Sequence, residues 1–179
     1  MKKEVLPSRR HCIDLIRKNN SDNIVKHSLK VNSVAMYLAK KLVKKGEIID
    51  LDLVDRASLL HDIDKIESLK KGNHGIIGER ILKEKGFHKI AVIVRKHVLD
   101  QILYGLNTWE EKIVFYADKR VVDDKIVSLE ERLKYIKNRY AHINEKLMDK
   151  YSEIEKKILI LENEIFSEIN IAKDLKAIK

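Results

Sequence analysis

The sequence predicts a protein that is almost entirely helical. Only one of its 179 residues is a proline and six are glycines, so the chain holds few of the residues that interrupt helices. Hydrophobic residues recur at steps of three and four, as on one face of a helix, whereas the alternation typical of strands is scarce. With 44% hydrophobic residues, the chain can form one globular domain with a core, or one domain with a helical appendage. We therefore expect an all-α helical bundle.

Two helices are expected before residue 46. Ser8 can cap the first, which ends near residue 20, and the second covers residues 22–45 because Gly46 stops it. His27 lies on the apolar stripe of the second helix, four residues before Val31, and therefore faces inward.

A histidine and an aspartate stand side by side after the third predicted helix. That short amphipathic helix covers residues 54–60 and carries His61 and Asp62 into the protein interior. A buried ionised carboxylate is costly unless it is paired or bound to a metal. The chemistry is therefore expected at this pair.

The middle of the chain predicts two further inward histidines. Asn73 is expected to cap a helix on which His74 shares a face with two isoleucines, Ile77 and Ile81. The next helix covers residues 88–97 and points His97 inward at its end.

An aspartate lies on the apolar stripe of the helix that follows. Thr108 and Glu111 have the spacing of a capping box, which opens a helix that extends to Val121. Asp118 comes four residues after Val114 on that stripe, where a carboxylate needs an explanation. A buried salt bridge or cap is one explanation, and a ligand role is the other.

A long amphipathic run closes the chain. Ser128 and Glu131 have the spacing of a second capping box. After them, apolar residues recur with heptad-like spacing, and the positions between them are charged. One or two long helices are expected, as a coiled coil or a hairpin arm, and packing or self-association is the ordinary role of such a stripe. The stripe consists of Leu133, Ile136, Tyr140, Ile143, Leu147, Tyr151, Ile154, Ile158, Leu161 and Ile165.

Charge and composition limit the partners. The net charge of +9 is consistent with an anionic partner, such as a nucleotide, a nucleic acid or an acidic surface, and equally with a solubility habit. Aromatic residues are only 6% of the chain and form no basic and aromatic platform, which argues against nucleic acid. Cys12 is the single cysteine, so no intramolecular disulfide is possible and a reducing cytoplasm is expected. No segment has the roughly 18 apolar residues of a membrane span.

The inward polar residues are best explained together, by a metal site. Imidazole and carboxylate donors suit Mn, Fe, Co, Ni or Zn better than Mg or Ca, and the lack of clustered cysteines argues against structural zinc. Asp62 has two oxygens and could bridge two ions. The residues concerned are His27, His61, Asp62, His74, His97 and Asp118.

These residues resemble the motif of a known family. His27, then His61-Asp62, then Asp118 within Tyr116-Ala117-Asp118-Lys119-Arg120-Val121, is similar to the pattern of the HD-domain metal-dependent phosphohydrolases. His74 and His97 match the subset that binds two metals, which includes helical diadenosine-tetraphosphate hydrolases and cyclic-dinucleotide phosphodiesterases. The resemblance covers roughly residues 22–140 and implies an HD-domain bundle with a long C-terminal helix or helical arm.

The resemblance also implies a ligand set. Asp62 would bridge two divalent transition-metal ions, with Fe or Mn preferred and Co, Ni, Zn or Mg as alternatives. One ion would be held by His27, His61, Asp62 and Asp118, and the second by Asp62, His74 and His97.

The resemblance also implies roles for charged residues near these ligands. Lys65 matches the family lysine after the dyad and would meet substrate phosphate, so that Asp62 and Lys65 form the catalytic pair. Lys119 and Arg120 would either attract phosphate or form ordinary ion pairs. Asp64 stands where the family often has glycine, and its carboxylate could weaken phosphate binding, tune metal choice or face solvent.

Two functions follow as hypotheses. The first is a cytoplasmic hydrolase that uses metal-activated water on a small phosphorylated substrate, expected to be a nucleotide ester or anhydride. The alternative is a nucleotide-sensing or scaffold protein that keeps the HD fold and acts through its C-terminal helices, which could also form a homo-oligomer. Residues 1–127 would be the catalytic core, and residues 128–179 would pack on it or mediate association. No base-recognition motif narrows the substrate further.

Overall fold

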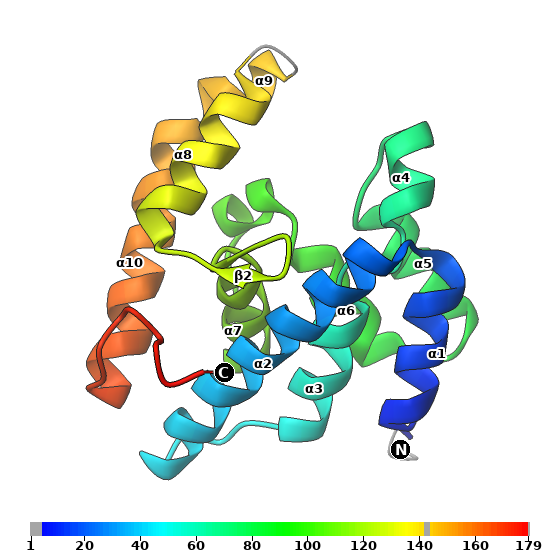
Figure 1. The fold of residues 1–179 in the computed structure, drawn as a ribbon, viewed down its shortest axis with the longest axis horizontal. Coiled ribbons are helices and arrows are strands. Elements are labelled where there is room, and N and C mark those ends of the chain that lie inside the picture. The colour runs from blue at the N-terminus through cyan, green and yellow to red at the C-terminus, as the bar shows by residue number, and fades with distance from the viewer. Residues whose placement is uncertain (1–4, 142–143, 179) are drawn as a thin grey trace.

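The structure, a computed structural model, describes residues 5–141 and 144–178 and confirms the all-α class (Figure 1). Among these residues the only strands are two short antiparallel ones, with Val121 opposite Ile126. The elements are α1 (Arg9–Asn19), α2 (Asp22–Lys44), α3 (Leu51–Leu60), α4 (Lys65–Lys71), α5 (Ile76–Glu84), α6 (His88–Lys96), the 3-10 helix η1 (Leu99–Tyr104), α7 (Trp109–Asp118), β1 (Val121–Val122), β2 (Lys125–Ile126), α8 (Leu129–Tyr140), α9 (Glu145–Asp149) and α10 (Tyr151–Ile169).

Three of the predicted caps are present. The Ser8 hydroxyl accepts a hydrogen bond from the backbone N–H of His11 at the start of α1. Thr108 accepts from the N–H of Glu111 at the start of α7. Ser128 and Glu131 form a reciprocal capping box at α8. Each cap satisfies N–H groups that the helix itself leaves free, which fixes where these helices begin.

Two predicted boundaries are wrong. Asn73 does not cap a helix, because it has a positive φ of 60° and α5 begins three residues later. His74 therefore lies in the turn before α5 and not on it. Likewise α7 ends at Asp118, and Val121 lies in β1 although its side chain is buried as expected.

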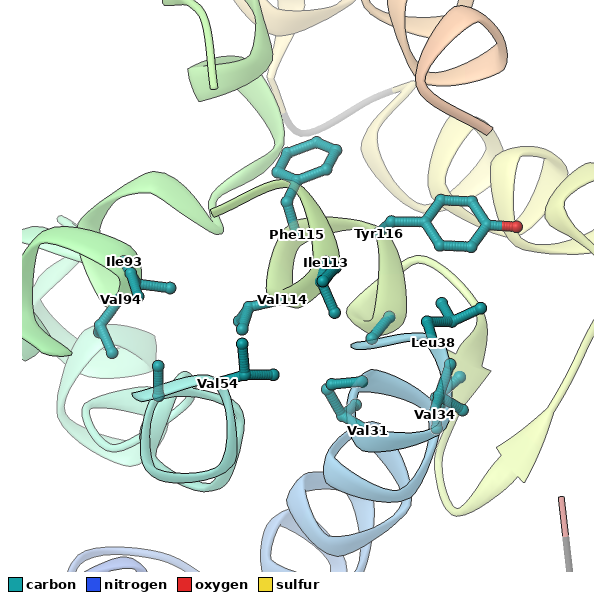
Figure 2. Close-up of a cluster of buried hydrophobic side chains, with 14 of the residues drawn as sticks. Val31, Val34, Leu38, Val54, Ile93, Val94, Ile113, Val114, Phe115 and Tyr116 are labelled. Atoms are coloured by element: carbon teal, nitrogen blue, oxygen red, sulfur yellow. The ribbon is translucent and has the colours of Figure 1, made fainter. Parts of the chain in front are cut away.

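The hydrophobic core lies where α2, α3, α6 and α7 meet (Figure 2). Valine and leucine side chains from α2 face Val54 of α3 and the apolar side of α7. The cluster continues into the C-terminal helices, where Leu133, Ile136, Ile154 and Ile158 are buried in it. This continuous packing holds the ends of α3, α6 and α7 in fixed relative positions.

The C-terminal run folds back on itself as a helical hairpin, with α8 and α10 side by side and α9 at the tip (Figure 1). The Tyr151 hydroxyl at the start of α10 donates a 2.7 Å hydrogen bond to the Leu133 carbonyl in α8. Helix α10 packs against η1, α2 and α7. Ile143 of the predicted stripe lies outside the described residues. None of the described helices is both long and apolar enough to cross a membrane.

Candidate metal centre

The six predicted ligands come together although they lie on separate elements. His27 is on α2, His61 and Asp62 follow α3 directly, and Asp118 is the last residue of α7. His97 follows α6, and His74 comes from the turn before α5. Five of the six residues lie at or just beyond a helix end, so these helix ends meet at one point beside His27 of α2.

Asp62 lies at the centre of the cluster. Its Oδ2 is 4.0 Å from Nε2 of His27 and 3.8 Å from Nε2 of His61. Its Oδ1 is 3.0 Å from Nε2 of His74 and 3.5 Å from Nε2 of His97. One carboxylate oxygen therefore faces each histidine pair, which produces two groups of potential metal ligands that share Asp62.

Asp118 joins the first group. Its Oδ1 is 3.1 Å from Nε2 of His27 and 3.6 Å from Nε2 of His61. The first group thus contains two imidazoles and two carboxylates. The second contains two imidazoles and the other oxygen of Asp62.

The second nitrogen of each histidine is held by an acceptor. Nδ1 of His27 donates to the Asp123 carbonyl at 2.8 Å, and Nδ1 of His61 donates to the Ser58 carbonyl at 2.8 Å. The same nitrogen of His97 donates to the Val94 carbonyl. Because Nδ1 carries the proton in this tautomer, Nε2 presents a lone pair to the centre, which is the arrangement typical of metal-binding histidines.

Asp64 plays this part for His74. One of its oxygens accepts from Nδ1 of His74 at 2.9 Å, and the other accepts from the backbone N–H groups of Gly75 and Gly78 at 2.8 and 2.9 Å. Asp64 is buried, so the suggestion that it faces solvent is wrong. Its carboxylate therefore caps α5, although Asp64 precedes that helix by more than ten residues, and it also orients the imidazole of His74.

These residues fit divalent cations. Nε2 of His61 is buried and has no hydrogen-bond partner among the described residues, although it points at two carboxylates. An unpaired buried acceptor costs about 1–3 kcal/mol, a cost that a coordinated cation would remove. Nitrogen and oxygen donors in this mixture suit Mn, Fe, Co, Ni or Zn.

Electrostatics keep Asp62, Asp118 and His97 in the protonation states that metals need. Burial alone would raise the pKa of Asp62, but Lys65 and His61 outweigh it and hold that pKa well below its usual range. Lys119 and His27 do the same for Asp118. Burial lowers the pKa of His97 to about 4, so its imidazole is neutral near pH 7. Burial would lower the pKa of His27 and of His74, but hydrogen bonds to Asp118 and to Asp62 raise both, so that protons compete with a cation at these two imidazoles.

Two lysines border the carboxylates, in different ways. Nζ of Lys65 is 3.3 Å from Oδ1 of Asp62, and its side chain is 32% exposed, so it can also reach a bound molecule. Nζ of Lys119 is buried and already bonded to Asp118 and to the His97 carbonyl, 3.0 Å away. The ion-pair alternative therefore describes Lys119 better than phosphate attraction.

Arg120 is not brought to the cluster. Its guanidinium is buried and donates to the Val127 carbonyl, the Tyr116 hydroxyl and the Lys173 carbonyl. These bonds tie α7 to the C-terminal segment. The structure thus gives Arg120 a structural role in place of the suggested phosphate contact.

Sequence reasoning missed one cation, Arg132 on α8. Its Nη2 is 3.9 Å from Oδ1 of Asp118. The available signal was its position beside Leu133 and four residues before Ile136, at the edge of the apolar stripe. That signal only shows that the side chain borders the core, and not what it meets there.

The fold and the site together define a class: a helical bundle with a buried histidine and aspartate centre for divalent metals. The sequence model of the HD domain family matches residues 24–123, a segment that contains all six ligands. The chain belongs to the HD-domain family, whose members are generally metal-dependent phosphohydrolases.

Relatives extend the comparison. An uncharacterized protein of Methanocaldococcus jannaschii is 33% identical over 168 residues, which cover 86% of this chain and 94% of that protein. A tRNA (cytidine(56)-2'-O)-methyltransferase of Picrophilus torridus is 30% identical over 152 residues, covering 76% of this chain and 43% of the longer enzyme. Ribonuclease Y of Clostridium perfringens is 30% identical over 103 residues, covering 57% of this chain and 19% of that protein. No solved structure matches the chain.

Proposed function

We propose that the protein is a metal-dependent phosphohydrolase that acts on a nucleotide or a related phosphoester or phosphoanhydride. The observation that carries this proposal is the pair of ligand groups that share Asp62. A bridging carboxylate between two cation positions is the arrangement that two-metal hydrolytic sites require. The number of ions and their identity are part of the proposal, with two ions expected and Fe or Mn preferred.

The residues divide the work. Divalent ions, when bound, lower the pKa of a coordinated water and polarise phosphoryl oxygens. Asp62 and Asp118 supply the negative charge that holds such ions, and the four imidazoles are oriented toward them by their Nδ1 hydrogen bonds. Lys65 stands beside Asp62 with a partly exposed side chain, and it would bind a phosphoryl oxygen of the substrate.

The substrate is proposed to be small and anionic. The net charge of +9 and the partly exposed Lys65 at the centre support an anion. Ribonuclease Y and the tRNA methyltransferase are named for RNA, so RNA oligonucleotides belong in the test beside nucleotides. A cytoplasmic location stays a prediction.

Metal content and hydrolysis, measured on the same samples, test the proposal. We would purify wild type, His97→Ala and His88→Ala without chelator, because His88 is exposed at the opposite end of α6 and is a matched control. Elemental analysis should give close to two ions per chain in wild type and in His88→Ala. His97→Ala should lose about one ion together with hydrolysis of a nucleotide panel. Wild type without ions, and without turnover after addition of Mn or Fe, would contradict the proposal.

One observation favours the alternative, a nucleotide-sensing or scaffold role. Leu159 and Ile160 are exposed on α10, where they could meet a partner or a second copy of the chain. Light scattering of wild type and of Ile160→Glu would test this. A wild-type dimer that the variant abolishes, without any hydrolysis by the wild type, would favour the scaffold role.

A further inference from the structure

Arg132 reaches the metal centre from outside the HD segment. It lies on α8, beyond the residues 24–123 that the family model matches. Its Nη2 is 3.9 Å from Oδ1 of Asp118, and its side chain is only 16% exposed. That separation is too long for a hydrogen bond, so the guanidinium is attracted to Asp118 but does not donate to it.

The guanidinium is also incompletely satisfied. Nε of Arg132 is buried and finds no acceptor within residues 5–141 and 144–178. The carbon of the guanidinium stands 5.4 Å from the centre of the Tyr135 ring, a cation–π contact that uses none of its N–H groups as conventional donors. A buried donor without an acceptor costs about 1–3 kcal/mol. The site is therefore suited to an acceptor that comes from outside the chain.

The surrounding charges indicate an anion. Lys65 stands by Oδ1 of Asp62, while Lys119 and Arg132 stand by the two oxygens of Asp118. Divalent cations bound at the two carboxylates would neutralise the charge that Lys65 and Arg132 face, whereas Lys119 keeps its hydrogen bond to the His97 carbonyl. An arginine is always protonated and cannot ligate a metal, but its planar donor fork matches two oxygens of a phosphoryl group.

The geometry points to Arg132 as a substrate-binding residue that donates to a phosphoryl oxygen, so that α8 forms one wall of the active site. The inference rests on the proposed function for its substrate class. It also gives the C-terminal hairpin a role in binding, because the hairpin's first helix carries this side chain.

Calorimetry with inorganic phosphate tests this without requiring turnover. Wild type, Arg132→Ala, Arg132→Lys and Arg139→Ala would be loaded with Mn²⁺ and titrated. Arg139 is the matched control, because it lies on the same helix and also contacts Tyr135, but is exposed. Phosphate should bind wild type and Arg139→Ala alike, and Arg132→Ala roughly 10- to 100-fold more weakly, as expected for loss of a charge-assisted hydrogen bond. Arg132→Lys should fall in between, and it carries the test if the alanine variant does not fold.

A purely structural role gives a different pattern. In that case Arg132→Ala would melt at a lower temperature and still bind phosphate as wild type does, which would overturn the inference. Added guanidinium should restore phosphate binding to Arg132→Ala if the inference is correct, and should not if the arginine only supports the fold. Failure of loaded wild type to bind phosphate would also overturn it.

The two proposals can fail separately. Phosphate binding that depends on Arg132, in a protein that hydrolyses no member of the panel, would refute the hydrolase and keep the anion site. Hydrolysis with an unchanged KM in Arg132→Ala would keep the hydrolase and refute the role of Arg132.

Discussion

Asp64 determines which nitrogen of His74 faces the metal centre. Its two oxygens accept from Nδ1 of His74 and from the N–H groups of Gly75 and Gly78. Since both oxygens are acceptors, the imidazole proton is kept on Nδ1 and the lone pair on Nε2. An outer carboxylate of this kind typically changes metal affinity 10- to 100-fold when it is lost.

Asp64→Asn should therefore weaken one of the two metal positions. If the amide oxygen keeps its bonds to the two glycine N–H groups, the amide nitrogen must face His74, and the imidazole proton moves to Nε2. We expect about 10- to 100-fold weaker binding at the position formed by His74 and His97. Nitrogen NMR of His74 in metal-free protein would detect the changed tautomer. Asp52→Asn, at an exposed carboxylate of α3, is the control; equal metal affinity in all three proteins would refute the role of Asp64.

Replacing Arg120 should change the stability of the fold and leave binding at the centre unchanged, in contrast to replacing Asp64. Arg120→Met removes donors from the Val127 and Lys173 carbonyls and leaves Glu162 without a nearby guanidinium. Breaking buried polar pairs of this kind costs roughly 3–5 kcal/mol. Urea unfolding should show that loss, with KM unchanged for any substrate found. A raised KM in a fully folded variant would show instead that Arg120 contributes to binding the substrate.

The clustering of the six candidate ligands could be predicted from sequence because most of them lie on, or directly follow, an apolar face with clear periodicity. His27 and Asp118 are polar residues within stripes of valine and alanine, and such an exception can be recognised in the sequence alone. Arg132 was missed, and the alternatives for Asp64 and Arg120 stayed open, because nothing in the local pattern shows that their partners are His74 and the Lys173 carbonyl, or that Arg132 faces Asp118. Only tertiary packing determines such pairs.

At the scale of elements, the error at Asn73 has a clear cause. The sequence offers Asn73 as a local cap, but the carboxylate of Asp64 occupies the start of α5 instead. Gly78 allows this, because a Cβ there would lie 2.9 Å from Cγ1 of Val94 and 3.3 Å from Cγ of Asp64. A cap supplied by a side chain from another segment cannot be recognised by local spacing.

A hydrogen bond from Tyr151 helps to join the two helices of the C-terminal hairpin. Burial, and then the neighbouring Glu155, raises the pKa of Tyr151 to about 12 from its usual 10.0. Between these values the folded protein keeps a proton that the unfolded chain loses. The stability that comes from the neutral phenol is thus complete below pH 10 and is lost as pH rises through 12.

Tyr151→Phe should lower the free energy of unfolding by about 1 kcal/mol at pH 7, because it removes the hydrogen bond to the Leu133 carbonyl. Above pH 10 the wild type should lose stability more steeply than the variant, so the difference between them shrinks. Denaturant midpoints measured from pH 7 to 11 would check this. Parallel pH curves for the two proteins would show that Tyr151 does not titrate with unfolding.

For the whole molecule, the core and the metal centre are separate sources of stability. The buried hydrophobic cluster draws on helices from α1 to α10 and on Leu175 beyond them, so most of the apolar burial comes from side chains that would bind no metal. We therefore expect the protein to fold without metal, and the metal to add stability by binding only the folded state.

Chelation should lower the melting temperature without loss of helix. At metal concentrations 100-fold above Kd, each occupied site adds about 2.7 kcal/mol, which corresponds to roughly 5–10 °C per ion for a domain of this size. Far-UV circular dichroism with and without chelator would measure both quantities, with His97→Ala expected to show a smaller shift. Unfolding of the protein by chelator at 25 °C would show that the metal is required for folding.

The hydrogen bonds that orient the ligands also determine how the site tolerates genetic change. His27, His61 and His97 are oriented by main-chain carbonyls, at Asp123, Ser58 and Val94. A substitution at those three positions can displace the carbonyl but cannot remove it, and Asp123, with a positive φ of 53°, is the position where displacement is easiest. His74 depends on a side chain, so among the four acceptors that hold Nδ1, Asp64 is the one that a point mutation can remove outright.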